Sequence, residues 1–239
     1  YEIIIVDDGS TDDTCKIVKA NFNDKRINIF QNTNKGMAYS RNFGVNKSHH
    51  EWIVILDHDD ISLPQRLNEY NKKILDNLNI DLLFSDMIYF NEKTSFLRFD
   101  KQYKKQKNKP YNLNLNINNA FLNLVEYGCF IGSSSVAFRK SKYFMTNGFR
   151  EDYKFLGDYL FFLDLAKISN FFCIKEPLVK WRMHSTQSTE IRHNLYIYEM
   201  IRLYCNLFFD KHLTIKYKIK FVYRIIFLIL KLFILKFIK

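Results

Sequence analysis

The nine residues WIVILDHDD at positions 52–60 decide the fold class that the sequence predicts. Residues 52–56 are entirely apolar, which is typical of a strand buried on both faces of a sheet. The run ends abruptly in the acidic cluster 57–60, and the stretch YEIIIVDDGS at 1–10 repeats this plan with an acidic pair at 7–8. In open α/β sheets, ligands lie beyond the carboxyl ends of the strands. We therefore expect both acidic clusters to lie at one edge of a sheet.

Outward from these stretches, strand-like apolar runs alternate with helix-like segments, which favours an α/β fold. Ser10 or Thr11 is expected to cap the first helix, and Pro64 suits the first turn of the third. We expect a mixed, mostly parallel sheet flanked by helices. The expected strands are 1–6, 27–30, 52–56 and 81–89, the expected helices are 12–20, 37–46 and 64–78, and 101–110 is expected to be a mobile loop.

Charge is distributed unevenly along the 239 residues, whose formal net charge is +11. From Lys211 to the end there are eight basic residues and no acidic one, which leaves 28 basic against 25 acidic residues in 1–210. A nearly balanced body argues against specific nucleic-acid binding, which requires a basic face on the folded domain. Four widely spaced cysteines indicate neither a zinc site nor a disulfide framework, so a reducing compartment is expected.

The C-terminal segment predicts a helix at a membrane surface. Its longest uncharged run, Ile225 to Leu230, is far shorter than the roughly 20 residues of a spanning helix. Four basic residues (Lys216, Lys220, Arg224 and Lys231) fall within about 80° of each other on a helical projection, beside Ile, Leu and Phe. We expect a domain at 1–210 and a membrane-associating tail at 211–239, on the cytoplasmic face of the membrane. The alternative is a helix packed on its own domain with outward lysines.

The two acidic clusters also predict chemistry. Carboxylates converging on one sheet edge form a site for a hard cation, and such a cation would hold phosphate oxygens. Three carboxylates within positions 57–60 repel one another unless something positive binds. The alternative is that these aspartates cap the following helices, which we favour for Asp12 and Asp60.

Three blocks in this sequence resemble one enzyme family. They are VDDGSTD at 6–12, NKG at 34–36 followed by SRN at 40–42, and LDHDD at 56–60 with Pro64 behind it. In order and spacing they resemble family 2 inverting glycosyltransferases with the GT-A fold, over roughly residues 1–190. The Lys, Asn and Ile content suggests a bacterial source.

The resemblance implies roles for individual residues. Asp8 is expected to accept a hydrogen bond from the uracil of a UDP-sugar, Asp57 to lie near the ribose or sugar, and Asp59 to coordinate Mn²⁺ or Mg²⁺. The implied nucleotide-sugar site consists of Asp7, Asp8, Arg41, Asp57 and His58, and the implied metal ligands are Asp59 and His184. The alternatives are a surface helix arginine for Arg41 and a structural histidine for His184.

The general base implied by the resemblance is Asp158. The family usually has Glu-Asp at this place, whereas this chain has Gly157-Asp158. An inverting transfer needs one carboxylate to take the proton of the acceptor hydroxyl. Glu151-Asp152 is the second choice, and a helix N-cap is the alternative role for Asp158. The loop at 132–135 is expected to face the donor or the acceptor.

The leading prediction is a metal-dependent glycosyltransferase that uses a nucleotide-sugar and a glycan or lipid-linked acceptor in cell-surface polysaccharide or lipooligosaccharide synthesis. The resemblance also predicts a strand and helix upstream of residue 1, so the chain is interpreted as N-terminally truncated. Three alternatives remain. They are an inactive membrane-associated fragment, a sugar nucleotidyltransferase, which would need a Gly-rich basic phosphate loop, and a non-specific nucleic-acid binder using 101–109 and the tail.

Overall fold

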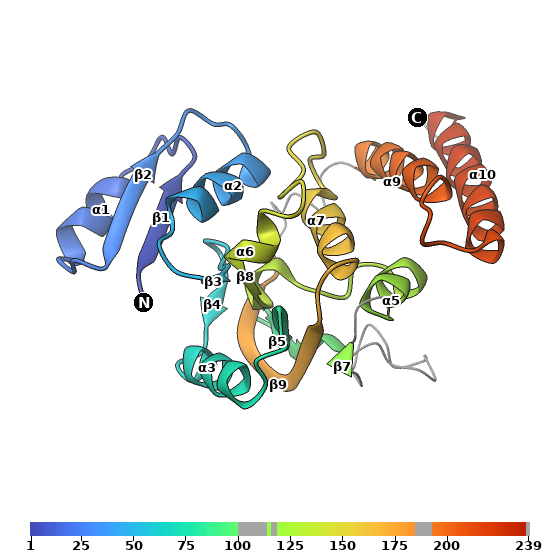
Figure 1. Ribbon diagram of the computed structural model, residues 1–239. Coiled ribbons are helices and arrows are strands. Elements are labelled where there is room, and N and C mark those ends of the chain that lie inside the picture. The colour runs from blue at the N-terminus through green and yellow to red at the C-terminus, as the bar shows by residue number, and fades with distance from the viewer. Residues whose placement is uncertain (100–113, 116–118, 185–192, 238–239) are drawn as a thin grey trace. The chain divides into compact units, whose positions relative to one another are not determined.

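Figure 1 shows a computed structural model of the chain, which describes residues 1–99, 114–115, 119–184 and 193–237. The chain divides into two compact units, Tyr1–His184 and Ser185–Lys239. We expected the boundary near residue 210, but the helix before that point is grouped with the C-terminal helix. The expected loop at 101–110 lies outside the described residues.

The first unit begins with a two-stranded parallel sheet of β1 (Ile3–Asp7) and β2 (Ile27–Gln31), connected by α1 (Thr14–Asn21). The next helix, α2 (Met37–Lys47), packs on β1, where Gly44 lies beside Val6. The predicted cap of α1 by Ser10 or Thr11 is wrong, because α1 begins after Asp13. The Ser10 hydroxyl donates instead to the carboxylate of Asp7, at 2.5 Å.

A seven-stranded sheet forms the centre of the first unit. Its order is β3 (Trp52–Val54), β8 (Val136–Arg139), β5 (Leu82–Phe90), β9 (Phe171–Arg182) and β4 (Ile61–Ser62), with β6 (Ser95–Leu97) on β5 and β7 (Asn114–Leu115) on β9. The sheet is mixed, as expected. The expectation of mostly parallel strands is wrong, because among the described strands of this sheet only β5 and β9 pair in parallel. Apolar runs identify strands but carry no information on their direction.

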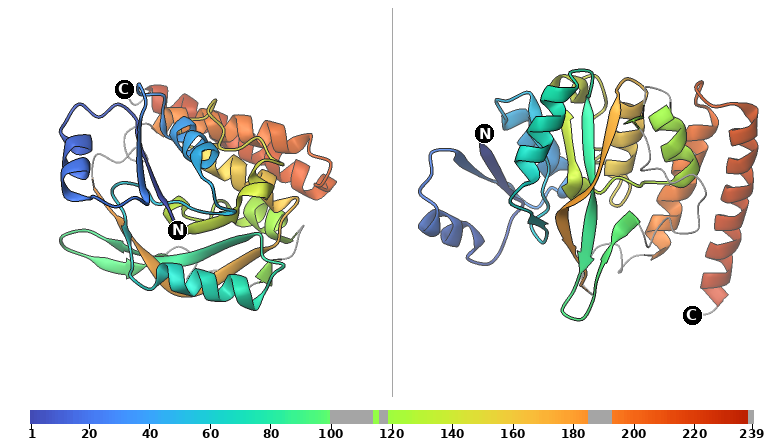
Figure 2. Two further views of the ribbon diagram at one scale, coloured as in Figure 1. Left: turned by 60° about the vertical axis from the view of Figure 1, so that its left-hand side comes forward. Right: turned by 90° about the horizontal axis from the view of Figure 1, so that it is seen from below.

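Helices cover both faces of this sheet (Figure 2). On one face lies α3 (Arg66–Asp76), where Tyr70 packs with Leu83 of β5 and Ala137 of β8. On the other face Phe138 contacts Phe161, with ring centroids 5.1 Å apart. That face is covered by α5 (Asn119–Tyr127), α6 (Lys140–Tyr143) and α7 (Gly157–Ala166). Successive residues of β8 therefore supply the two cores, as the alternation of a strand requires.

Pairing between β5 and β9 is interrupted by a bulge. Ser85 lies opposite Ile174, but the next residue of β5, Asp86, lies opposite Pro177. The extra β9 residues include Lys175 and Glu176, which are both exposed. Bulges bend and twist a strand, and a proline is tolerated there because the ladder is already broken. Beyond the bulge, β9 runs on to the site described below.

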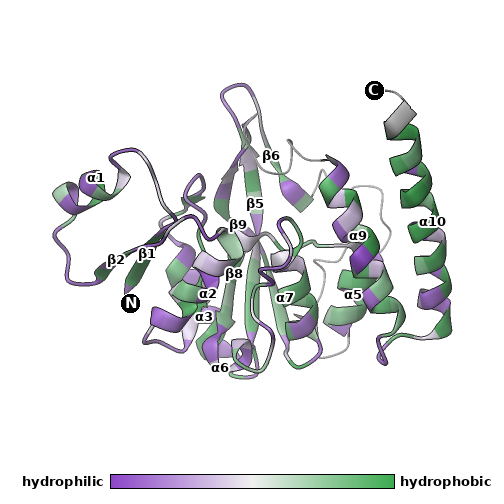
Figure 3. Cartoon of the chain, turned by 90° about the horizontal axis from the view of Figure 1, so that it is seen from above, coloured by the Kyte–Doolittle hydropathy of each residue, from purple (hydrophilic) through white to green (hydrophobic). Residues whose placement is uncertain are grey.

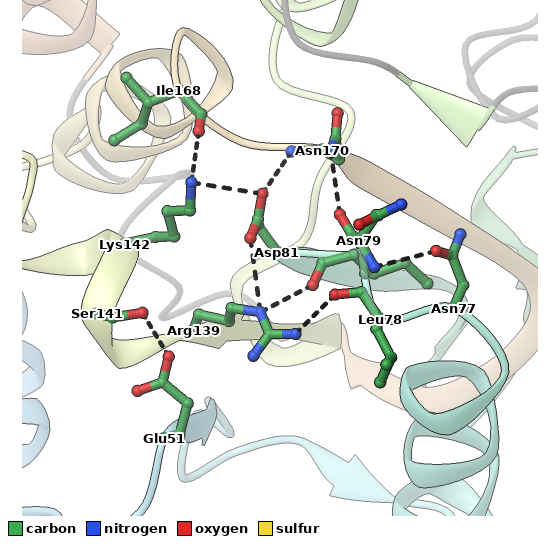
Figure 4. Close-up of polar contacts among 11 residues, drawn as sticks. Glu51, Asn77, Leu78, Asn79, Asp81, Arg139, Ser141, Lys142, Ile168 and Asn170 are labelled. Atoms are coloured by element: carbon green, nitrogen blue, oxygen red, sulfur yellow. Dashed lines mark hydrogen bonds and ion pairs between the residues drawn. The ribbon is translucent and has the colours of Figure 1, made fainter.

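The buried carboxylate of Asp81 connects three strands at the end of the sheet where β5 begins (Figure 4). Asp81 precedes β5, and its Oδ2 accepts from the N–H of Asn170 at 3.0 Å. The Nε of Arg139 lies 3.5 Å from Asp81 Oδ1, and the Nζ of Lys142 lies 3.8 Å from Oδ2. Arg139 also donates to the carbonyl of Leu78 at 3.0 Å. These contacts tie the start of β9 and the end of β8 to the start of β5.

The second unit is a pair of helices, α9 (His193–Phe208) and α10 (Ile215–Phe237). Phe221 of α10 is 1% exposed and stacks on Tyr204 of α9, with ring centroids 5.4 Å apart. Arg224, one turn on, donates to the hydroxyl of Tyr204 at 3.4 Å. Among the described helices, none combines the length and hydropathy needed to cross a bilayer.

Candidate active site

The acidic loop 57–60 connects β3 to β4 and is held from both sides. On one side, the backbone N–H of Asp57 donates to the hydroxyl of Ser134, at 2.9 Å, in the short 3₁₀ helix η1 (Ser133–Ser135). On the other side, Arg182 at the end of β9 donates its N–H to Asp60 Oδ1 and its Nε to the carbonyl of Asp59, both at 3.1 Å. The loop is therefore fixed by two distant segments.

Asp59 and His184 lie together in this structure. The Nε2 of His184 is 3.1 Å from Oδ2 of Asp59, and both side chains are partly exposed. They come together because β4, which follows the acidic loop, pairs with β9, and His184 lies two residues after β9. The two residues predicted as metal ligands are thus neighbours, although their role stays a prediction.

Arg41 forms an ion pair with Asp57, with Nη2 2.6 Å from Oδ1. Its side chain is only 9% exposed, and its guanidinium carbon lies 5.6 Å from the ring centroid of Phe149. The alternative of a surface helix arginine therefore does not hold. Arg41 presents a positive charge directly beside the acidic loop, while its role as a contact to the donor stays a prediction.

The other acidic pair organises the end of β1. Asp8 accepts from the N–H of Lys35 at 2.8 Å and from that of Gly36 at 2.6 Å. Hydrogen bonds from the hydroxyl and N–H of Ser10, together with the thiol of Cys15, lower the pKa of Asp7 to about 2. Gly36 is the N-cap of α2, so the helix that carries Arg41 begins at the carboxylate of Asp8. Helix α2 thereby links the two acidic clusters.

Asp60 is buried and differs from its neighbours. Burial raises the pKa of its carboxyl to about 6, and its Oδ2 has no hydrogen-bond partner among the described residues. The expectation that Asp60 caps the next helix is wrong, because the N-cap of α3 is Gln65. Asp12 is not the N-cap of α1 either, because that position is Asp13, but its carboxylate accepts from the N–H and hydroxyl of Thr14, the first residue of the helix.

Asp158 contacts η1, the same 3₁₀ helix that contacts the acidic loop. It is the second residue of α7, whose N-cap is Leu156, so the N-cap alternative is wrong. Its Oδ2 accepts from the hydroxyl of Ser133 at 2.6 Å. Because Ser134 accepts from Asp57, two consecutive serines connect the predicted base to the predicted donor site. The loop 132–135 therefore contacts both Asp57 and Asp158, while the expectation that it faces the donor or the acceptor stays a prediction.

The second-choice base is engaged in structural contacts. Glu151 accepts from Nδ2 of Asn42 at 2.8 Å, and Asp152 pairs with Arg150 at 3.0 Å. Gly157 is closely packed, because a Cβ at that position would lie 2.7 Å from the carbonyl oxygen of Arg150. The Glu-Asp pair usual in the resembled family therefore does not fit this backbone without a shift at Arg150.

The sequence assigned no role to two residues near the site, Asn42, which belongs to the SRN block, and Arg66. Asn42 follows Arg41 on α2, accepts from the Tyr143 hydroxyl at 2.7 Å and holds the loop around Phe149. Arg66 of α3 is 1% exposed and donates to the carbonyl of Ile55, just before the acidic loop, at 3.0 Å. A charged residue on the inward face of a helix was the available signal for Arg66. His58 is exposed at the tip of the loop.

The residues present fit a cation that the substrate helps to hold. Within the described part of the chain, no three His, Cys, Asp or Glu side chains are arranged to hold a metal ion by themselves. Asp59 and His184 would supply two ligands. Mg²⁺ is commonly bound by one or two carboxylates, water and substrate phosphates, so two protein ligands suffice when a diphosphate completes the site.

Comparisons with known proteins identify the family of this chain. A family model described as "Glycosyl transferase family 2" matches residues 1–141. An uncharacterized glycosyltransferase of Rickettsia typhi is 28% identical over 200 residues, which are 81% of this chain and 58% of the relative. One from Methanocaldococcus jannaschii is 38% identical over 109 residues, which are 45% of this chain and 37% of the relative.

Among solved structures, S. aureus TarS 1-349 in complex with UDP-GlcNAc superposes with a TM-score of 0.69 at 16% identity, over 94% of this chain and 62% of that one. A second structure, TarS 1-349 in complex with UDP, has a TM-score of 0.65. The expected GT-A fold is confirmed. The chain spans less than two thirds of the length of each of these proteins.

Proposed function

Because this chain belongs to glycosyl transferase family 2, we propose that it transfers a sugar from a nucleotide-sugar to a hydroxyl of a glycan or lipid-linked acceptor, with inversion at the anomeric carbon. The observation that carries the proposal is the pair of Asp59 and His184, 3.1 Å apart, beside the ion pair of Arg41 and Asp57. Carboxylates that can hold a cation, next to an arginine, suit a ligand with a diphosphate, because both the cation and the arginine attract phosphate oxygens.

On this proposal, Asp59 and His184 hold Mn²⁺ or Mg²⁺. When bound, the cation neutralises negative charge on the diphosphate leaving group, which carboxylates alone cannot do. Arg41 supplies a second positive charge, already ordered by Asp57 and by the ring of Phe149. Because this guanidinium is nearly buried, it loses little side-chain entropy when the donor binds.

A uridine donor is supported by the TarS structures, which contain UDP and UDP-GlcNAc. In this chain the base would lie beyond β1, near Asp7 and Asp8. Asp8 already accepts two backbone hydrogen bonds, and each carboxylate oxygen has a further lone pair for the N3–H of uracil. His58, exposed on the acidic loop, remains a candidate donor contact.

Asp158 is the proposed general base. It takes the proton of the acceptor hydroxyl while that oxygen bonds to the anomeric carbon, and the bond from that carbon to the diphosphate oxygen breaks. The hydrogen bond from Ser133 orients the carboxylate, and the N–H of Tyr159 fixes its other oxygen at 2.7 Å. With a lipid-linked or surface-polysaccharide acceptor, the transfer would take place at the inner face of the cell membrane. The second unit could then hold the enzyme at that surface.

The test measures nucleotide release from UDP-GlcNAc, with GDP- and dTDP-sugars for comparison, using Mn²⁺ and a membrane extract as acceptor. Asp59→Asn and Asp158→Asn should each lower release by about 100-fold or more, and EDTA should abolish it. Asp76→Asn, an exposed carboxylate on α3, is the matched control and should leave the rate unchanged.

Binding separates the two roles. Calorimetry with UDP and Mn²⁺ should show lost affinity for Asp59→Asn but retained affinity for Asp158→Asn. Donor binding without release in any extract would identify an inactive member of the family. Unchanged release in both variants would refute the assigned site, and sugar-1-phosphate-dependent consumption of UTP would favour a nucleotidyltransferase.

A further inference from the structure

Helix α10 exposes a continuous apolar face. Its 23 residues span about 34 Å, and Figure 3 shows that most of this length is hydrophobic. Between Ile215 and Ile234, ten apolar or aromatic side chains are each 42% to 70% exposed. Apolar patches of this extent are uncommon on soluble proteins and mark interaction surfaces.

These ten side chains share one side of the helix. At about 100° per residue they fall within an arc of about 160°, bounded by Ile229 and Phe227. Phe221, which is buried against Tyr204 of α9, lies on the opposite side. The apolar face is therefore a second face, additional to the one that packs the two helices together.

Basic residues border this face. On the projection, Lys220, Arg224 and Lys231 line one border and Lys218 lies at the other, whereas only Lys216, in the first turn, interrupts the arc. No acidic residue occurs between Lys211 and the C-terminus. The sequence predicted the basic row, and the structure adds that the apolar residues between the two basic borders are exposed.

We propose that this face of α10 lies in the interface of a bilayer that contains anionic lipids, with the helix axis parallel to the membrane plane. Interfacial helices bury one apolar face at the boundary of headgroups and acyl chains while bordering lysines and arginines contact lipid phosphates. Aromatic residues such as Tyr223, Phe227 and Phe233 suit that depth.

A second copy of the chain is a poorer occupant. Two α10 faces packed against each other would bring two sets of basic borders together with no acidic side chain in either segment to compensate. Like charges at an interface oppose association. Anionic lipid supplies the missing complementary charge, and a membrane can cover the whole length of the face.

The experiment is flotation of the full chain with vesicles of phosphatidylcholine alone or mixed with phosphatidylglycerol. Binding should be strong only to the mixed vesicles and should weaken with salt. The triple substitution Ile226→Ser, Phe227→Ser and Leu230→Ser should reduce binding at least tenfold. The matched control is Leu75→Ser with Leu78→Ser, apolar residues of the first unit that are at least as exposed, and this variant should bind like the parent.

A second measurement does not depend on a disruptive variant. Phe227→Trp should be quenched by brominated acyl chains more strongly than the two natural tryptophans. The proposal would be overturned if the triple variant kept both its helicity and its vesicle binding, or if the parent bound equally to both vesicle types. A monomer–dimer equilibrium that is lost in the triple variant would also overturn it. Nucleotide release from the donor in the presence of a water-soluble acceptor reports on the first unit, so failure here is distinguishable from failure of the proposed function.

Discussion

Replacing Asn42 by alanine should detach the loop at 148–152 from α2. The Asn42 side chain makes four hydrogen bonds, to the N–H and carbonyl of Phe149, to the hydroxyl of Tyr143 and to Glu151, at 2.7 to 2.9 Å. Phe149 and Tyr143 are buried, so their polar groups cannot turn to water when the amide is removed. The variant leaves them without their partner.

The magnitude follows from these bonds. A neutral hydrogen bond contributes about 1 kcal/mol net, and an unsatisfied buried group costs about 1–3 kcal/mol. Three bonds to Phe149 and Tyr143 therefore give a loss of about 3 kcal/mol, to which the exposed bond to Glu151 adds little. For a domain of this size that loss lowers the melting temperature by about 6–12 °C.

The assay is equilibrium denaturation followed by tryptophan fluorescence. Both tryptophans, Trp52 and Trp181, belong to the first unit, so the signal reports on that unit. Asn46→Ala is the control, because Asn46 is one turn further along α2 and makes one exposed bond to the carbonyl of Asn42. It should cost less than about 0.5 kcal/mol. Equal losses in the two variants would refute the reasoning.

Three further predictions concern the same unit. Gly157→Ala should destabilise it by about 1–3 kcal/mol in the same assay, because the new Cβ meets the carbonyl of Arg150 at 2.7 Å, and unchanged stability would contradict that packing. Burial holds the pKa of Asp60 near 6, so without metal the unfolding free energy should fall as pH rises from about 4 to 6, by on the order of 1–2 kcal/mol after allowance for solvent screening. Asp60→Asn should lack this slope, and a parallel slope in the variant would assign it elsewhere. Arg139→Ala should cost about 2–3 kcal/mol by leaving Asp81 and two carbonyls short of a donor, and a loss below about 0.5 kcal/mol would show that the network contributes little.

The sequence predicted the early elements well because their signals are local. The apolar runs ending in Asp7 and Asp57 correspond to strands or their immediate continuations, and the helix expected at 37–46 is observed as Met37–Lys47. Strand β3 ends at Val54, two residues before the apolar run does. Local apolarity therefore marks a strand but sets its end only approximately.

Long-range features were harder to predict. The resemblance indicated that Asp59 and His184 share a site, yet the reason they meet is the pairing of β4 with β9, two elements more than 100 residues apart. The roles of Arg66 and Asn42 were not predicted because they depend on which carbonyls and loops the fold brings to these side chains. A polar side chain carries no signal of its partner in the sequence.

The bulge between β5 and β9 divides β9 into two segments whose alignments are independent. A residue gained or lost at Lys175 or Glu176, both exposed, changes only the size of the bulge and leaves His184 opposite Asp59. After Val179, pairing is continuous as far as Arg182, so a single insertion there would turn every following side chain to the other face of the sheet. Length variation among relatives should therefore accumulate at the bulge and be absent from 179–184.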